Sequence, residues 1–288
     1  MGTTLNISGN TKLVGLIGSP VAHSMSPAMH TASFAHEGID AVYLAFDVVP
    51  DQLGDVVKGF ADQGLAGYNV TMPCKTKILP FLDELSPAAE LMGAVNTVKI
   101  ENGRSIGYNT DGEGFTTNLR HLGLDPQGCD ATVLGAGGAG SAIYTQLALD
   151  GARAIHVFNI RDGFWDATVE KVAHLADKTG CDVTLHDLAD REDLARCIAE
   201  SDVLVNATRI GMGDTADQCL VDEDMLHDGL TVGDTVYDPR ETKLIQMAKA
   251  RGLKTAPGLG MLLQQAALGE KAWFDIEMPT AYIEKVFF

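Results

Sequence analysis

Short runs of apolar, often β-branched residues alternate with segments of helical periodicity along most of the chain. In the first part we predict strands at residues 13–17, 42–46, 67–70, 95–100 and 106–108. A second series lies at residues 131–134, 154–158, 183–185, 203–206 and 231–236, interleaved with amphipathic segments such as residues 142–149. The alternation predicts an α/β fold, and the second series is typical of a doubly wound parallel sheet.

Gly135, Gly137 and Gly140 follow the first strand of the second series with the spacing G-x-G-x-x-G. A strand that ends at Gly135 must turn sharply, the backbone at Gly137 must approach a pyrophosphate, and the next helix must pack closely at Gly140. Each step favours a residue without a Cβ. Since a strand precedes the motif and a helix and a further βα unit follow it, we predict a dinucleotide site rather than a merely tight turn.

The next strand leads into Asn159-Ile160-Arg161-Asp162, about twenty residues past the last glycine, where such folds read the adenine ribose. Asp162 can accept a hydrogen bond from a ribose 2′-OH and would repel a 2′-phosphate. Arg161 can stack on adenine or pair with that phosphate. Because one cation lies here beside an acid, we favour NAD and leave NADP possible. A solvated turn with incidental charges is the alternative.

The order of these motifs divides the chain into two domains, which 288 residues are long enough to form. No linker composition marks the boundary, so the motifs place it near residue 111. Beyond Gly258, helical segments at residues 261–273 and 279–286 have no strand left to pair with, and we expect them to pack on the first domain. We therefore predict an N-terminal α/β domain at residues 1–111, completed by residues 259–288, and a Rossmann-type doubly wound dinucleotide-binding domain at residues 112–258.

Charge and composition narrow the classes of partner. With 21 basic and 39 acidic residues, the formal net charge of −18 argues against nucleic acid and anionic membranes as partners. No stretch approaches the roughly 20 apolar residues of a membrane span, and residues 1–10 are polar. The five cysteines lack C-x-x-C spacing, which weighs against a structural zinc site. We expect a cytoplasmic protein without a metal.

Polar residues that can carry chemistry follow the first strand. Ser24 and Ser26 precede Pro27, which suits the first turn of a helix, and Ser26 suits the N-cap position. Because helix N-termini attract anions, these two hydroxyls can hold a carboxylate. Plain capping of the helix is the alternative.

Two later segments add a lysine and an aspartate. The run from Asn69 to Lys75 leaves a buried strand, and its end lies where open α/β sheets place ligands. Lys75 is either a solvated surface charge or a proton donor. Asp111 precedes a helical pattern and is either an N-cap or a second polar group of the site. One lysine and one aspartate that converge on a secondary alcohol suffice for proton transfer coupled to hydride transfer.

Six motifs together resemble the shikimate dehydrogenase family in order and over essentially the whole chain. They are Ser24-x-Ser26-Pro27; Asn69-Val70-Thr71-x-Pro73-x-Lys75; Ala94-Val95-Asn96-Thr97; Asn109-Thr110-Asp111-Gly112; Gly135-Ala136-Gly137-Gly138-Ala139; and Gly258-Leu259-Gly260-Met261-Leu262 with Gln265. Members that depend on NADP usually carry N-R-T and a further basic residue where this chain has Asn159-Ile160-Arg161-Asp162. In this it resembles the quinate/shikimate branch, except that Thr71 stands where many members have serine.

The resemblance implies reversible, NAD(P)-dependent oxidation of a ring hydroxyl of shikimate or quinate to the 3-dehydro ketone. It implies that Lys75 gives a proton to the forming alkoxide and takes it back in the reverse reaction, while Asp111 orients the same group. It implies substrate contacts for Ser24 and Ser26 with the carboxylate, for Thr71, Asn96 and Gln265 with hydroxyls, and for Tyr237 nearby. The implied cofactor residues are Gly135, Ala136, Gly137, Gly138, Ala139, Asn159, Arg161, Asp162, Arg209, Gly258 and Met261.

Other functions stay open at this point. An enzyme with the same scaffold can act on another cyclic polyol acid, such as an aminoshikimate. A non-catalytic dinucleotide-binding sensor is a second alternative, although Lys75 and Asp111 argue against it because a binding module needs no proton donor. The residues leave open whether the protein is a monomer or a homodimer.

Overall fold

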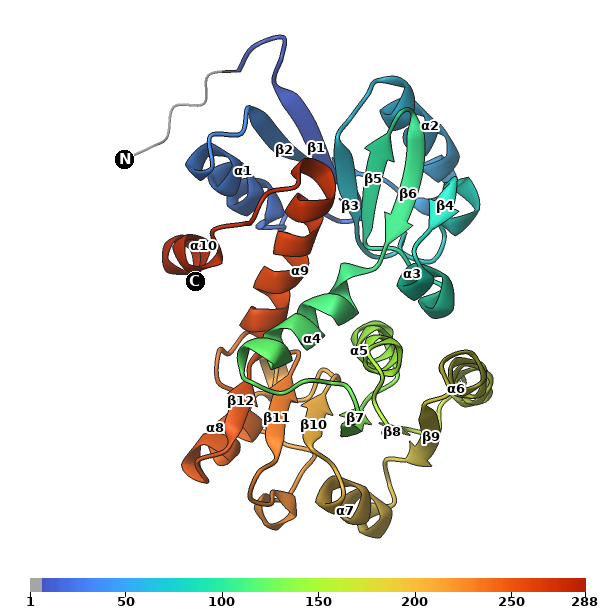
Figure 1. Cartoon of the computed structure of the whole chain (residues 1–288), viewed down its shortest axis with the longest axis vertical. Helices are drawn as coiled ribbons and strands as arrows, with labels where there is room; N and C mark the ends of the chain where they lie inside the picture. Colours follow the sequence, from blue (N-terminus) through green and yellow to red (C-terminus); the bar gives the residue numbers. More distant parts are fainter. Residues whose placement is uncertain (1–6) are drawn as a thin grey trace. The chain divides into compact units, whose positions relative to one another are not determined.

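The computed structural model describes residues 7–288 and divides into two compact units (Figure 1). The first unit comprises the chain up to Thr110 together with Gln265–Phe288, and the second comprises Asp111–Gln264. The division therefore falls within helices α4 (Thr110–His121) and α9 (Gly258–Phe274). Residues 1–6 of the predicted polar start lie outside the described residues.

The first unit contains a mixed six-stranded sheet in the order β2-β1-β3-β5-β6-β4. Its first three strands run parallel, and β5 is antiparallel to both of its neighbours. The predicted strands are confirmed, although the one expected from residue 95 begins at Thr97, and the two-residue β4 was not predicted. The strands are β1 (Lys12–Gly18), β2 (Ala41–Asp47), β3 (Gly67–Val70), β4 (Glu84–Leu85), β5 (Thr97–Glu101) and β6 (Arg104–Tyr108).

Helices on this sheet bury two apolar clusters, one around Ile17 and Tyr68 and one around Phe34, Tyr43 and Trp273. The helices are α1 (Ser26–His36), α2 (Leu53–Asp62), α3 (Pro87–Met92), α10 (Thr280–Phe287) and the C-terminal part of α9. The two predicted C-terminal helices are thus confirmed. Trp273 of α9 reaches the sheet, where its Nε1 donates a hydrogen bond to the Val98 carbonyl at 3.0 Å. Gly67 makes room for this indole, because a Cβ there would lie 2.3 Å from it.

A buried polar pair joins α1 to α9 inside the first unit. His30 Nδ1 lies 2.7 Å from Glu270 Oε1, and Ser33 Oγ donates to Glu270 Oε2 at 2.6 Å. Each of the three residues is at most 1% exposed. Removing one partner of such a pair leaves an uncompensated buried group, which typically costs about 3–5 kcal/mol. The pair therefore fixes the segment of α9 that carries Gln265 against the helix that begins at Ser26.

The second unit contains six parallel strands in the order β12-β11-β10-β7-β8-β9. Numbered from β7, this is the 3-2-1-4-5-6 order of the Rossmann fold, and the predicted fold class is confirmed. The strands are β7 (Asp130–Leu134), β8 (Ala154–Asn159), β9 (Asp182–Asp187), β10 (Val203–Asn206), β11 (Thr231–Asp234) and β12 (Lys254–Ala256). Its helices are α5 (Gly138–Leu149), α6 (Trp165–Thr179), α7 (Arg191–Ala199) and α8 (Lys243–Ala250), with most of α4 and the start of α9.

Helix α5 is buried on nearly all sides, so the prediction that residues 142–149 form an amphipathic segment is wrong. The helix packs against β7, β8 and α6. On a further side Gly112 of α4 approaches so closely that a Cβ there would lie 2.2 Å from the Ala142 carbonyl oxygen. With neighbours on several sides, the helix presents little surface to water. None of the helices in residues 7–288 is both long and apolar enough to cross a membrane.

Candidate active site

The glycine motif forms the turn between β7 and α5. Gly135 has φ of +100°, a conformation that L-residues with a side chain rarely adopt. A Cβ at Gly140 would lie 1.9 Å from the Gly135 carbonyl oxygen, so the helix can start this close to the strand only with glycine there. Gly137, the N-cap of α5, is exposed, and a Cβ there would meet nothing within 4 Å. The turn therefore offers an open backbone surface at a helix N-terminus, where a pyrophosphate fits.

Beside this turn, the end of β8 holds its own polar contacts. The Ala136 N–H donates to Asn159 Oδ1 at 3.2 Å. Arg161 Nε donates to Asp187 Oδ2 at 2.7 Å, and the guanidinium lies 4.4 Å from the centre of the Trp165 ring. Sequence reasoning missed Asp187, which lies 26 residues further along the chain. The Ala189 N–H and the Arg161 guanidinium both lower the pKa of Asp187, so the arginine faces a carboxylate.

Asp162 closes a local turn before α6, where its Oδ1 accepts a hydrogen bond from the Phe164 N–H at 2.9 Å. It is exposed, as are Arg161 and Phe164. The residue that follows Arg161 in the chain thus adds a negative charge, while the arginine itself is paired with Asp187. This arrangement opposes a second negative charge, such as a ribose 2′-phosphate, more than Arg161 alone suggests.

The loops after β10 and β11 carry the remaining predicted residues of the second unit. A Cβ at Gly135 would touch Ala207 and Thr208, so the loop that leads to the exposed Arg209 packs against the glycine turn. Gly258 approaches the loop after β11 in the same way, since a Cβ there would lie 2.5 Å from the Thr235 carbonyl oxygen. Tyr237 in that loop is 48% exposed, whereas Met261 is buried.

The hydroxyls that follow β1 differ in one respect from the prediction. Helix α1 begins at Ser26, and its N-cap is Met25, which makes no side-chain capping bond. The prediction of Ser26 as the N-cap is therefore wrong. Ser24 Oγ accepts a hydrogen bond from the Ser26 N–H at 3.2 Å, and the backbone at Met25 is already helical. Both serines are half-buried beside the N-terminus of α1.

Lys75 lies in a turn that leaves the end of β3. The Thr71 N–H donates to the Ile17 carbonyl at 2.9 Å, which ties the start of the turn to β1. The Lys75 carbonyl accepts a hydrogen bond from the Val95 N–H at 2.8 Å, which fixes the far end. The side chain of Lys75 is half-buried, while that of Lys77 is exposed. The fold thus fixes the backbone of Lys75 at the carboxyl end of the sheet, where ligands bind in open α/β folds.

Asp111 stands in the first turn of α4, and the alternative that it is the N-cap is wrong because the helix already begins at Thr110. Asn96 holds this helix start, since its Oδ1 accepts the Thr110 N–H at 2.8 Å and its Nδ2 donates to Thr110 Oγ1 at 3.0 Å. Asn69, another residue of the family motifs, accepts from the Tyr43 hydroxyl at 2.7 Å and donates to Thr97 Oγ1. Sequence reasoning missed these supporting roles, because each contact joins segments distant along the chain.

The predicted residues are therefore shared between the two units. The first unit holds Ser24, Ser26, Thr71, Lys75, Asn96 and Gln265. The second begins with Asp111 and holds Tyr237 and the predicted cofactor residues Gly135, Ala136, Gly137, Gly138, Ala139, Asn159, Arg161, Asp162, Arg209, Gly258 and Met261. Each unit on its own carries one part of the predicted chemistry.

Comparison with known proteins assigns the chain to a family. Residues 16–98 match the shikimate dehydrogenase substrate binding domain, and residues 258–286 match the shikimate 5′-dehydrogenase C-terminal domain. A shikimate dehydrogenase (NADP(+)) of Listeria monocytogenes is 46% identical over 286 residues, which cover 99% of this chain and 98% of the relative. The chain belongs to the shikimate dehydrogenase family. The resemblance of the motifs is thereby confirmed.

Two further members bear on the branch and on the ligands. A quinate/shikimate dehydrogenase of Escherichia coli is 38% identical over 283 residues, covering 98% of each chain. The crystal structure of shikimate 5-dehydrogenase from Listeria monocytogenes in complex with shikimate and NAD has a TM-score of 0.95, with 45% identity and coverage of 99% of each chain. Among relatives with about 45% identity, one is named for NADP(+) and one is bound to NAD in its crystal structure.

Proposed function

We propose that this protein catalyses the NAD(P)-dependent, reversible oxidation of a ring hydroxyl of shikimate or quinate to the 3-dehydro ketone. The observation that carries the proposal is that the Val95 backbone holds Lys75 and that the Asn96 side chain holds Thr110, the residue directly before Asp111. A dehydrogenase needs both groups at fixed positions, whereas a sensor needs neither. The first unit is proposed to bind the substrate and the second to bind the dinucleotide.

In the proposed reaction, Lys75 Nζ gives a proton to the alkoxide that forms when the ketone is reduced. In the oxidation it accepts that proton from the hydroxyl. Asp111 hydrogen-bonds the same oxygen and orients it. The bound dinucleotide supplies the acceptor or donor of the hydride. The turn from Gly135 to Gly140 and the N-terminus of α5 would hold its pyrophosphate.

Substrate recognition is proposed to rest on hydroxyls and amides rather than on arginines. Ser24 and Ser26, with the N-terminus of α1, would bind the ring carboxylate. Thr71, Asn96 and Gln265 would bind ring hydroxyls, and Tyr237 would lie nearby. Asn96 has a second task, because its contacts with Thr110 position Asp111. The formal net charge of −18 gives an overall field that opposes an anionic substrate. Local hydrogen-bond donors such as these hydroxyls and amides would therefore have to bind it.

We propose further that NAD is preferred and that NADP is also accepted. The NADP(+) in the names of several relatives favours the phosphorylated cofactor. The pairing of Arg161 with Asp187 favours NAD because it already neutralises the guanidinium, and Asp162 at the next position of the chain adds a further negative charge. The structural relative that holds NAD is consistent with this preference.

Asp162→Ala is expected to raise the ratio of kcat/KM for NADP to kcat/KM for NAD about tenfold, which corresponds to ~1.4 kcal/mol in transition-state free energy. The substitution removes a charge that repels the 2′-phosphate and an acceptor for the ribose 2′-OH. Initial rates with both cofactors measure the ratio. Asp182→Ala, an exposed acid at the start of β9, is the control and is expected to leave the ratio unchanged. An unchanged ratio in Asp162→Ala would show that Asp162 does not read the ribose.

The proposed activity is tested by mixing the purified protein with shikimate or quinate and with NAD or NADP, in four combinations, and following the absorbance of reduced nicotinamide. We expect the nicotinamide to be reduced in at least one of the four mixtures, and the ketone product to be identified by NMR. No reduction in any of the four would refute the proposed function. If the nicotinamide is reduced only when an aminoshikimate replaces shikimate and quinate, the enzyme acts on that cyclic polyol acid instead. If the protein binds the dinucleotide but oxidises none of these compounds, the result favours the sensor.

A further inference from the structure

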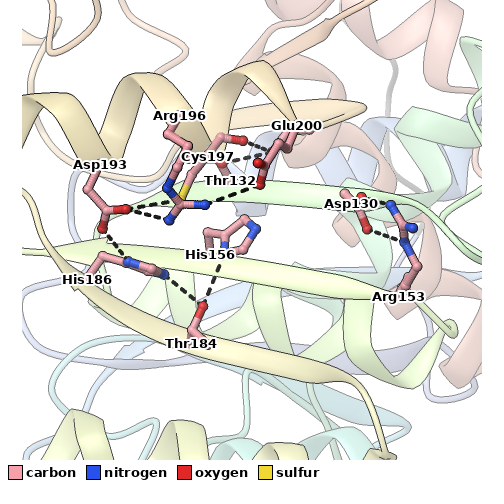
Figure 2. Close-up of polar contacts among 11 residues, drawn as sticks. Asp130, Thr132, Arg153, His156, Thr184, His186, Asp193, Arg196, Cys197 and Glu200 are labelled. Carbon is pink, nitrogen blue, oxygen red and sulfur yellow. Dashed lines mark hydrogen bonds and ion pairs between the residues drawn. The ribbon is translucent and has the colours of Figure 1, made fainter.

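A group of metal-ligating side chains lies in the second unit where α7 covers β8 and β9. His156 of β8, His186 of β9 and Cys197 of α7 each offer one ligand atom, and these atoms all lie within 4.8 Å of one another. Figure 2 shows them with their polar neighbours Thr184, Asp193 and Arg196. We propose that this cluster binds a divalent ion of the zinc class, in contrast to the sequence-based expectation of no metal site.

The fold brings these residues together by simple periodicities. His156 pairs with Thr184 across β8 and β9, and His186 pairs with Phe158 two residues further along each strand. Residues two apart on a strand share one face, so His156, Thr184 and His186 lie on the same side of the sheet. Asp193 and Cys197 are four residues apart on α7 and share one face of that helix. The sequence held no C-x-x-C or H-x-x-x-H signal because the three ligands come from three separate elements.

A chain of hydrogen bonds fixes the tautomers of both rings. His186 Nδ1 lies 2.6 Å from Asp193 Oδ2 and must carry the proton, because the carboxylate only accepts. Its Nε2 then accepts from Thr184 Oγ1 at 2.7 Å, and that oxygen accepts from His156 Nδ1 at 3.1 Å. With these tautomers Nε2 of His156 is unprotonated and can ligate a metal, and Nε2 of His186 can do so once the Thr184 hydroxyl turns its proton away. A carboxylate on the far nitrogen of a histidine is the arrangement found around zinc ligands.

The donor set and its spacing suit zinc. Tetrahedral zinc with bonds of about 2.0–2.1 Å to nitrogen and 2.3 Å to sulfur places these ligand atoms about 3.5 Å apart. The ligand atoms of the cluster lie at most 4.8 Å from one another. To bind zinc they must approach each other by about 1 Å, which small side-chain rotations allow. An imidazole pair with a thiolate selects zinc and its neighbours over calcium and magnesium, which prefer oxygen. The remaining coordination position is left to Asp193 or to water.

The solvent exposure of the cluster and the charges around it also permit a metal ion to bind. The side chain of His186 is 15% exposed and that of Asp193 is 26% exposed, so the cluster is reached from solvent, while Cys197 forms its buried floor. Arg196 Nη2 lies 3.3 Å from Cys197 Sγ and pairs with Asp193, while Nη1 of the same guanidinium pairs with Glu200. On binding, the thiol of Cys197 releases its proton to solvent as the sulfur–metal bond forms. Arg196 retains Glu200 as its partner when it moves from the sulfur.

The test uses the reduced, metal-free full-length protein titrated with Co²⁺ and then Zn²⁺. We expect one equivalent of Co²⁺ to bind with a thiolate-to-cobalt charge-transfer band in the near ultraviolet and with the visible bands of tetrahedral cobalt. Zn²⁺ is expected to displace it and to raise the Tm, since the ion binds only the folded unit. Absence of the charge-transfer band at saturating Co²⁺ would overturn the proposal.

Two variants locate the site. Cys197→Ser is expected to abolish the charge-transfer band, whereas Cys219→Ser, a partly buried cysteine outside the cluster, keeps it. Because Cys197 is fully buried, His156→Gln provides a milder change at a partly exposed ring. It should weaken Co²⁺ binding at least tenfold while the Tm of the metal-free protein stays within a few degrees of wild type. His174→Gln, an exposed histidine of α6, is the matched control, and equal affinities in these two histidine variants would refute the assignment.

Discussion

Lys75→Ala is expected to lower kcat for shikimate oxidation by about 10²–10⁴-fold, with little change in the Kd of shikimate. The amine is proposed to act on the hydroxyl proton, whose transfer belongs to the transition state and not to the bound ground state. A group that acts in this way supports turnover far more than binding. Steady-state rates give kcat, and calorimetric titration with shikimate gives the Kd.

Lys77→Ala is the control for this prediction. Lys77 lies in the same turn, but its side chain is exposed. Loss of its charge should change both kcat and Kd by less than about threefold, because an exposed lysine interacts weakly with groups around it. If Lys75→Ala weakens shikimate binding by as much as it lowers kcat, the lysine binds the substrate and does not transfer the proton.

Gly140→Ala is expected to abolish dinucleotide binding and to destabilise the second unit by ~3 kcal/mol or more. The new Cβ would lie 1.9 Å from the Gly135 carbonyl oxygen, which is backbone and cannot rotate away. The start of α5 must therefore shift from the end of β7, and the pyrophosphate turn is lost. Fluorescence titration with NADH measures binding, and thermal unfolding measures stability.

Variants of two neighbouring glycines separate a steric clash within the protein from the loss of the backbone surface that would bind the pyrophosphate. A Cβ at Gly137 or at Gly138 would meet nothing within 4 Å. Gly138→Ala is expected to keep the Tm, because its Cβ would meet no atom of the protein. Gly137→Ala should keep the Tm but weaken NADH binding at least tenfold, because its Cβ would occupy the space where the backbone meets the pyrophosphate. Wild-type affinity for NADH in Gly140→Ala would contradict the proposed position of the cofactor.

The strength of local patterns decided which elements were predictable. The β10 strand, Val203–Asn206, was predicted with its observed bounds because a short apolar run stands between polar segments. The strands β4 and β12 have two and three residues, too few to show a period. Helix α5 read as amphipathic because sequence periodicity does not reveal that α4 and α6 also pack against it.

The candidate site was predictable where a single segment defines it. The geometry of the glycine motif can be predicted from the motif itself, since each glycine marks a turn or a close approach within a few residues. The ion pair of Arg161 with Asp187 and the support of Thr110 by Asn96 join distant segments, so no local signal predicts them. The same holds for His156, His186 and Cys197, whose cluster depends on strand register and on the position of α7.

The central claim is that Lys75 and Asp111 act on one hydroxyl of shikimate or quinate beside a bound nicotinamide. A crystal structure of the wild-type protein with shikimate and NAD tests it most directly. We predict Lys75 Nζ and a carboxylate oxygen of Asp111 within about 3.2 Å of the same ring hydroxyl, and the ring carboxylate at Ser24 and Ser26. A complex in which the hydroxyl nearest the nicotinamide contacts neither Lys75 nor Asp111 would contradict the account.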